Sequence, residues 1–141
     1  MTEFFANQGM LIHAVRHLSP AEALTAIERG AVVVDIRESF EVDMKAFGVG
    51  AVIYLAASRL RDAFEQLPRD KPLILADCVG LHSKPAVAFL QEHGFADVAN
   101  LNGGIADWES AGMPMLADPD QQWTGSCACR LKPRKKYRIS G

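Results

Sequence analysis

The sequence has few cysteines and no long apolar run, and each absence excludes a class of protein. Three cysteines in 141 residues is a low and odd number, which does not fit the paired disulfides of a small secreted domain. No apolar stretch approaches the roughly 20 residues that a membrane-spanning helix needs. The opening MTEFFANQGM has an acidic residue and no basic one, unlike a secretory signal. We therefore expect a soluble, cytoplasmic protein without a membrane partner.

Positive charge is scarce in most of the chain and concentrated at its end. The last twelve residues, RLKPRKKYRISG, hold six of the fifteen Lys and Arg residues and no acid. The rest of the chain has nine basic residues and all seventeen acids. Its net charge is therefore about −8, and the net charge of the last twelve residues is +6. We expect residues 116–141 to be a flexible basic tail. Such a tail could bind an acidic protein, contact the acidic surface of its own domain, or stay solvated; nucleic acid is not the expected partner.

Short apolar runs alternate with helical patterns along residues 18–115. Continuous apolar runs such as AVVVDIR and PLILAD predict strands buried on both faces, as in parallel sheets. Ser19 as N-cap, Pro20 at the first helical position and Gly30 as a stop predict the first helix. This alternation indicates a single α/β domain with a mostly parallel central sheet flanked by helices, preceded by an N-terminal segment, 1–17. Strands are expected within 31–37, 50–55, 72–77 and 97–101, and helices within 18–30, 58–68, 83–95 and 102–114.

The loop DCVGLHSK follows the predicted strand 72–77, at the edge of a parallel sheet where ligands usually bind. Backbone N–H groups of the loop and of the helix that begins near Ser83 have no intrahelical partner, so they can form a cradle for an anion. A cysteine at the first loop position would be favoured as a reactive thiolate. A carboxylate there would instead be held as a fixed anion. Asp77 and Cys78 compete for this position.

Four stretches of the chain resemble one known family: LSPAEAL, VVDIRESFE, KPLILADCVGLHSKPAVAFLQEHGF and VANLNGGIADWESAGMPM. The most specific signal is L-x-G-G-x-x-x-W followed by G-x-P, downstream of a G-x-x-S loop. Over residues 18–115 the chain resembles the single-domain rhodaneses, sulfurtransferases that carry sulfane sulfur as a cysteine persulfide. The resemblance implies a small-molecule or protein sulfur donor or acceptor as partner, and no cofactor. It also implies that Asp35, Arg37 and Glu41 are structural charged groups.

The register of the loop decides which residue occupies the catalytic position. The loop of this family usually reads C-x-x-G-x-R-S. Aligned without a gap on Gly80 and Ser83, the cysteine of the family falls on Asp77 and its arginine on His82, whereas placing Cys78 there requires a deletion. Aspartate cannot form a persulfide, although its carboxylate could accept the loop N–H groups. Cys78 would then be a neighbour of the cradle, either reactive or without a role. The candidate loop residues are Asp77, Cys78, Val79, Gly80, Leu81, His82 and Ser83.

These substitutions lead to two hypotheses about function. The first is a sulfur-handling protein of the rhodanese family, a persulfide carrier or transferase whose standard thiosulfate turnover is weak or absent. The alternative is a non-catalytic rhodanese-like module that works by binding or regulation. His82 could replace the arginine in part, but with fewer hydrogen-bond donors and without a permanent charge.

Two further groups of residues could carry chemistry. Cys127 and Cys129 lie one residue apart in the tail, where they could bind a metal, close a strained disulfide or pass sulfur between them. The arginines around them would favour the thiolate. His13 and His17 would share one face if their segment were helical. A metal site made by both pairs is the less favoured interpretation, and we expect no bound metal.

Overall fold

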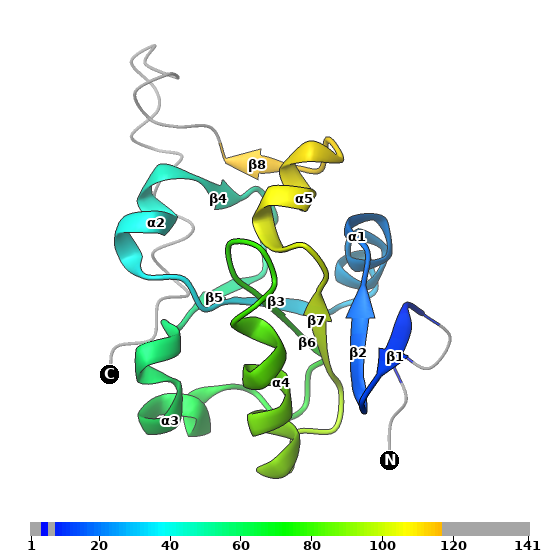
Figure 1. Ribbon diagram of the computed structural model, residues 1–141, viewed down its shortest axis with the longest axis vertical. Coiled ribbons are helices and arrows are strands. Elements are labelled where there is room, and N and C mark those ends of the chain that lie inside the picture. Colours follow the sequence, from blue (N-terminus) through cyan, green and yellow to red (C-terminus); the bar gives the residue numbers. More distant parts are fainter. Residues whose placement is uncertain (1–3, 6–7, 117–141) are drawn as a thin grey trace.

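The computed structural model describes residues 4–5 and 8–116 as an α/β domain built on a six-stranded sheet (Figure 1). The strand order is β1-β2-β7-β6-β3-β5. All neighbouring strands are parallel except the β1–β2 pair, which is antiparallel. The predicted fold class, a mostly parallel sheet flanked by helices, is therefore confirmed. The strands are β1 (Met10–Ile12), β2 (Val15–Leu18), β3 (Val32–Asp35), β5 (Val52–Tyr54), β6 (Leu73–Ala76) and β7 (Val98–Leu101).

Helices cover both faces of the sheet, and alternate strand residues feed two separate apolar clusters. Val33 and Ile74 pack on the face shared with α1, α2 and α5. Val34 and Leu75, their neighbours in sequence, pack on the face shared with α3 and α4. Successive side chains of a strand point to opposite faces, so continuous apolar runs serve both clusters. The helices are α1 (Pro20–Glu28), α2 (Ser39–Met44), α3 (Leu60–Ala63), α4 (Ser83–Glu92) and α5 (Gly104–Ser110).

The first helix begins as the sequence predicts. Ser19 Oγ accepts the N–H of Glu22 at 3.2 Å, and the Glu22 carboxylate accepts the N–H of Ser19 at 2.9 Å. This reciprocal capping box satisfies two backbone donors, and Pro20 occupies the first helical position. Gly30, with φ +114°, follows the helix in a conformation that residues with side chains rarely adopt.

One local prediction is wrong, and one question that the sequence left open is answered. The helix expected over 58–68 is split into a 3₁₀ turn (η1, Ala57–Arg59), α3 and a second 3₁₀ turn (η2, Phe64–Gln66). The buried side chains of Leu60, Ala63 and Leu67 recur at spacings of three and four, which suit both kinds of helix. The segment with His13 and His17 is not helical but a hairpin, because β1 and β2 pair and His13 lies between them with φ 50°.

A small second sheet was not expected from the sequence. β4 (Ala46–Phe47) pairs antiparallel with β8 (Met115–Leu116). Leu116, the first residue of the predicted tail, therefore belongs to a strand. The rest of that tail, with Cys127, Cys129 and the basic residues, lies outside the described residues, and its predicted properties stay predictions.

A buried ion pair closes the carboxyl end of β3. Asp35 is fully buried, and its carboxylate accepts two hydrogen bonds from the Arg37 guanidinium, at 3.0 Å from Nε and 2.8 Å from Nη2. The remaining donors of Arg37 reach the carbonyl groups of Glu41 (3.3 Å) and Lys45 (2.8 Å), which fixes α2 against the sheet. Burial disfavours the charge of Arg37, but the hydrogen bonds and charge of Asp35 outweigh it and raise the pKa of the guanidinium.

Breaking this buried pair should cost far more stability than breaking an exposed one. Asp35→Asn leaves the buried Arg37 without its counter-charge and should lower the free energy of unfolding by about 3–5 kcal/mol. Glu109→Gln is the control, because the Lys45–Glu109 pair (2.6 Å) lies at the surface with both side chains about half exposed. It should cost less than about 1 kcal/mol. Urea denaturation followed by circular dichroism measures both, and equal losses would contradict the assigned role.

Candidate functional site

The candidate site lies where the chain leaves the middle of the sheet. β6 is hydrogen-bonded to β3 on one side and β7 on the other, and its carboxyl end leads into residues 77–82 and then α4. Figure 1 shows this loop beside the amino end of α5. Open parallel sheets bind ligands at this edge, so the fold places the loop where the sequence predicts a site.

The carboxylate of Asp77 lies at the centre of the loop. The side chain is almost completely buried. Oδ1 accepts the N–H of Gly80, and Oδ2 accepts the N–H of His82 at 2.6 Å. The ring of His82 is largely exposed, with Nδ1 3.6 Å from Oδ2. Unpaired loop N–H groups thus converge on an anion, and this anion is a side chain of the protein itself.

Cys78 lies next to this centre and turns its side chain to solvent. It is a free, exposed cysteine. Its backbone carbonyl accepts the N–H of Ala106 at 3.1 Å, and the carbonyl of Asp77 accepts the N–H of Ile105 at 2.9 Å. These two N–H groups belong to the first turn of α5, where helical donors lack internal partners. The loop therefore caps α5 through its backbone, while the thiol of Cys78 is left accessible.

A pocket of about 280 Å³ opens beside the loop. Of the predicted loop residues, Asp77, Cys78, Val79 and His82 line it, together with Arg37. The other three are not among its lining residues: Leu81 is exposed, Gly80 is buried in the loop and Ser83 is buried at the start of α4. The remaining lining residues are Ile36, Glu38, Glu41 and Ala57.

Comparison with known proteins identifies the family. The family model for the rhodanese-like domain matches residues 19–111. The chain belongs to the rhodanese-like domain family. Curated relatives include the thiosulfate sulfurtransferase GlpE of Ectopseudomonas mendocina, 34% identical over 98 residues that cover 67% of this chain and 85% of the relative. GlpE of Pseudomonas aeruginosa strain LESB58 is 33% identical over 101 residues, covering 67% and 84%.

Solved structures agree with this assignment. A rhodanese-related protein from Thermoplasma volcanium is 30% identical, with a TM-score of 0.65 over 71% of this chain and 96% of that one. The polysulfide-sulfur transferase homodimer of Wolinella succinogenes is 22% identical, with a TM-score of 0.65 over 73% and 79% of the two chains, and shows the shared fold alone. Within the described part of this rhodanese-like domain, no helix is both long and apolar enough to span a membrane, and no cluster of three metal-binding side chains is found.

A buried hydrogen-bond chain leads from the loop to the far side of α4, and sequence reasoning missed it. The Oγ of Ser83 donates to Oδ1 of Asn100 on β7, and Nδ2 of Asn100 donates to Nδ1 of His17 on β2 at 3.0 Å. All three side chains are buried. The one available signal was an asparagine inside the apolar run DVANL, because a polar residue on a buried strand needs partners.

This chain of hydrogen bonds also determines the protonation state of His17. Its Nδ1 must carry a lone pair to accept from the Asn100 amide, so the ring is neutral with its proton on Nε2. Burial, and then the positive charge of Lys84, lower the pKa of His17 from its ordinary value of 6.5. The ring of His17 is therefore neutral in the native structure.

A comparison of alanine substitutions at two glycines of the rhodanese-like domain can distinguish the cost of backbone strain from the cost of a steric clash. Gly104 has φ +61°, and a Cβ there would lie 2.5 Å from the carbonyl oxygen of Asp77. Gly112 has φ +79° with no atom within 4 Å of its Cβ position. Gly112→Ala should cost about 1–2 kcal/mol of unfolding free energy from left-handed strain. Gly104→Ala should cost about 1–3 kcal/mol more and shift the amide resonances of Gly80 and His82. Equal costs would mean that the loop does not pack on α5 as described.

Acidification should destabilise the native domain partly through His17. As pH falls below about 6.5, the unfolded chain binds a proton on this ring that the native state, with its lowered pKa, does not bind. The free energy of unfolding should therefore fall with pH until the lowered native pKa is reached. His17→Gln should make this fall shallower, and His13→Gln is the control for removing one imidazole. Urea denaturation between about pH 8 and pH 5 measures the slope; an unchanged slope in His17→Gln would contradict the assignment.

Proposed function

We propose that this rhodanese-like domain handles sulfane sulfur as a persulfide carrier or transferase, and that its standard thiosulfate turnover is weak or absent. One observation carries the proposal. The carboxylate of Asp77 takes the N–H groups of Gly80 and His82, while the thiol of Cys78 lies exposed at the rim of the same pocket. The thiol is available, but the donors that would stabilise an anionic sulfur are already used.

The chemistry explains why turnover would be weak. A Cys78 thiolate would attack the outer sulfur of thiosulfate, so that a new S–S bond forms, the old one breaks, and sulfite leaves with the electron pair. The product is a Cys78 persulfide, whose negative charge needs hydrogen-bond donors. Losing one such donor typically slows a reaction about 10²–10³-fold. Asp77 also adds a fixed negative charge beside a reaction of two anions.

Several related assignments remain proposals. The thiosulfate sulfurtransferases among the relatives support a sulfur donor or acceptor as partner, either a small molecule or a protein. Cys127 and Cys129 are candidate acceptors of sulfur from Cys78. The basic residues near them are proposed to bind an acidic protein. We place the protein in the cytoplasm.

A non-catalytic role is the second candidate, and exposed apolar side chains favour it. Val79 and Leu81 on the loop are 50% and 63% exposed, and Phe40 and Met44 on α2 are 68% and 66% exposed. The loop and α2 border the same pocket through Val79 and Glu41. Exposed apolar groups around a fixed, buried carboxylate suit a surface that binds a partner.

Intact mass spectrometry after incubation with thiosulfate tests the first proposal. In a background with Cys127→Ser and Cys129→Ser, the protein should gain the mass of one sulfur atom, and Cys78→Ser should abolish the gain. Asp77→Cys in the same background should raise the thiosulfate:cyanide sulfurtransferase rate at least about 10²-fold, because the new thiolate receives the cradle donors.

Each negative result of these experiments would contradict a different part of the proposal. No adduct from thiosulfate or from a small-molecule persulfide donor, in any variant, would overturn sulfur handling. Sulfur found only on Cys127 or Cys129 of the wild-type chain would overturn the role of Cys78. No gain of rate in Asp77→Cys would overturn the assignment of position 77 to the catalytic position.

A further inference from the structure

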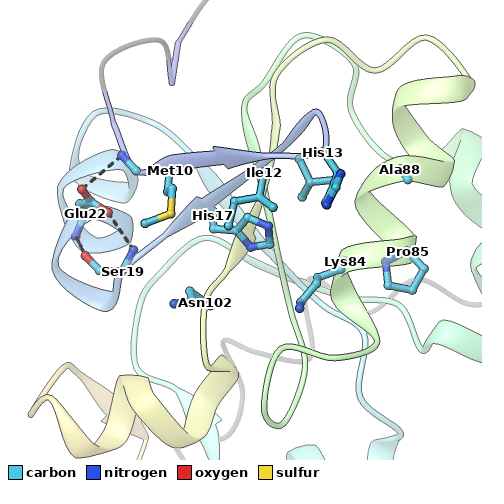
Figure 2. A pocket seen from close by; sticks show the side chains of 12 residues that line it. Met10, Ile12, His13, His17, Ser19, Glu22, Lys84, Pro85, Ala88 and Asn102 are labelled. Carbon is cyan, nitrogen blue, oxygen red and sulfur yellow. Dashed lines mark hydrogen bonds between the residues drawn. The ribbon is translucent and has the colours of Figure 1, made fainter.

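A second and larger pocket lies on the other side of the first turn of α4. Its volume is about 700 Å³, within the range of small-molecule sites. Figure 2 shows it between the β1–β2 hairpin and the start of α4. No step of the proposed sulfur chemistry uses this pocket. It is lined by Gly9, Met10, Ile12, His13, Val15, His17, Ser19, Glu22, Lys84, Pro85, Ala88 and Asn102.

The polar part of this pocket holds one cation, Lys84, and one carboxylate, Glu22. Lys84 is exposed, and among the described residues no carboxylate lies within ion-pair distance of its ammonium group. In Figure 2 its side chain points into the space that the ring of His17 also borders. The one acid of the lining, Glu22, is engaged, because its carboxylate accepts the N–H groups of Ser19 at 2.9 Å and Gly9 at 3.2 Å.

His17 supplies an unused hydrogen-bond donor. Its side chain is about nine-tenths buried, and Asn100 occupies its Nδ1. The proton is therefore on Nε2, and the described residues provide no acceptor for it. Ser83 fixes the direction of the hydrogen bonds. Its hydroxyl donates to the side-chain oxygen of Asn100, so the amide nitrogen of Asn100 is left to donate to His17. Nε2 is not among the fully buried unpaired side-chain atoms of the described residues, so it is accessible from the pocket that His17 lines, where solvent or a ligand can accept its hydrogen bond.

The rest of the pocket is apolar. Met10 and Ile12 on β1 are 63% and 43% exposed, so both offer apolar surface to a ligand. Val15, Pro85 and Ala88 continue this wall along β2 and α4. A ligand with a hydrocarbon body would cover these surfaces, and its burial would contribute to binding.

From this arrangement we propose that the pocket binds a small organic carboxylate with an apolar body. The carboxylate accepts the Nε2–H of His17 and pairs with the ammonium group of Lys84, while the hydrocarbon part packs on Met10, Ile12 and Pro85. Charge-assisted hydrogen bonds are the strong ones in such sites. The neutral His17 donates without adding a second positive charge.

Titration of the ¹⁵N-labelled full chain with octanoate tests the proposal. Amide shifts should be confined to residues 9–19, 84–88 and 102. Octanol, which has the same body without the charge, should bind about tenfold more weakly, as should Lys84→Ala with octanoate. Lys71→Ala, which removes another exposed lysine, is the control and should bind like the parent. Octylammonium should not bind.

The imidazole nitrogens of His17 give an independent readout. Their ¹⁵N shifts should identify a neutral ring protonated on Nε2 in the free protein, and octanoate should move the Nε2 signal. Equal affinities for octanol and octanoate would overturn the anion site, and so would equal octanoate affinities in Lys84→Ala and Lys71→Ala. A proton on Nδ1 of the free protein would overturn the role of His17. These outcomes do not depend on sulfur transfer, so they are distinct from a failure of the proposed function.

Discussion

The buried carboxylate of Asp77 organises the loop between β6 and α4. A carboxylate that is removed from water must find hydrogen-bond donors, and the N–H groups of Gly80 and His82 supply them. Meeting both donors folds the loop around the side chain. That fold points the carbonyl groups of Asp77 and Cys78 toward the first turn of α5. One side chain therefore determines the shape of the loop and, through it, the hydrogen bonds that join the loop to the first turn of α5.

A second buried carboxylate lies at the same edge of the sheet and is satisfied differently. Asp35 pairs in register with Ala76, the residue before Asp77, so two neighbouring parallel strands each end near an acid. Asp35 is neutralised by the guanidinium of Arg37, whereas Asp77 is held by backbone dipoles. Because Asp35 already engages two donors of Arg37, that cation is less available to an anion entering the pocket beside Cys78.

The sequence was sufficient for the main elements because their signals are local. Each of these signals predicts one structure: the apolar runs that end at Asp35 and Ala76 predict strands, and the cap at Ser19 predicts the start of a helix. The segment 58–68 departs from the single helix that its sequence predicts, because spacings of three and four between apolar residues fit both 3₁₀ and α geometry. The placement of His17 and Asn100 was not predictable, because β2 and β7 come together only when the sheet forms. In the candidate site, the sequence identified Asp77 and Cys78 as competitors, but only three-dimensional packing shows which of them points inward and where Ser83 donates its proton.

The two pockets beside α4 differ in charge, and this difference determines which anions each can accept. The pocket next to Cys78 is bordered by Asp77, Glu38 and Glu41, with Arg37 as its permanent cation and already paired. A dianion such as thiosulfate meets net negative charge there, and like charges repel most strongly where water is scarce. In the pocket on the other side of α4, one cation, Lys84, balances one acid, Glu22, whose carboxylate accepts the N–H of Ser19 at the cap of α1. Ser83 links the two, since it begins α4 at the end of the loop and directs its hydroxyl to Asn100 and hence to His17. A serine that donates into this buried chain does not offer that proton to a sulfur in the loop. The arrangement that weakens the first pocket as an anion site thus also orients the donor of the second.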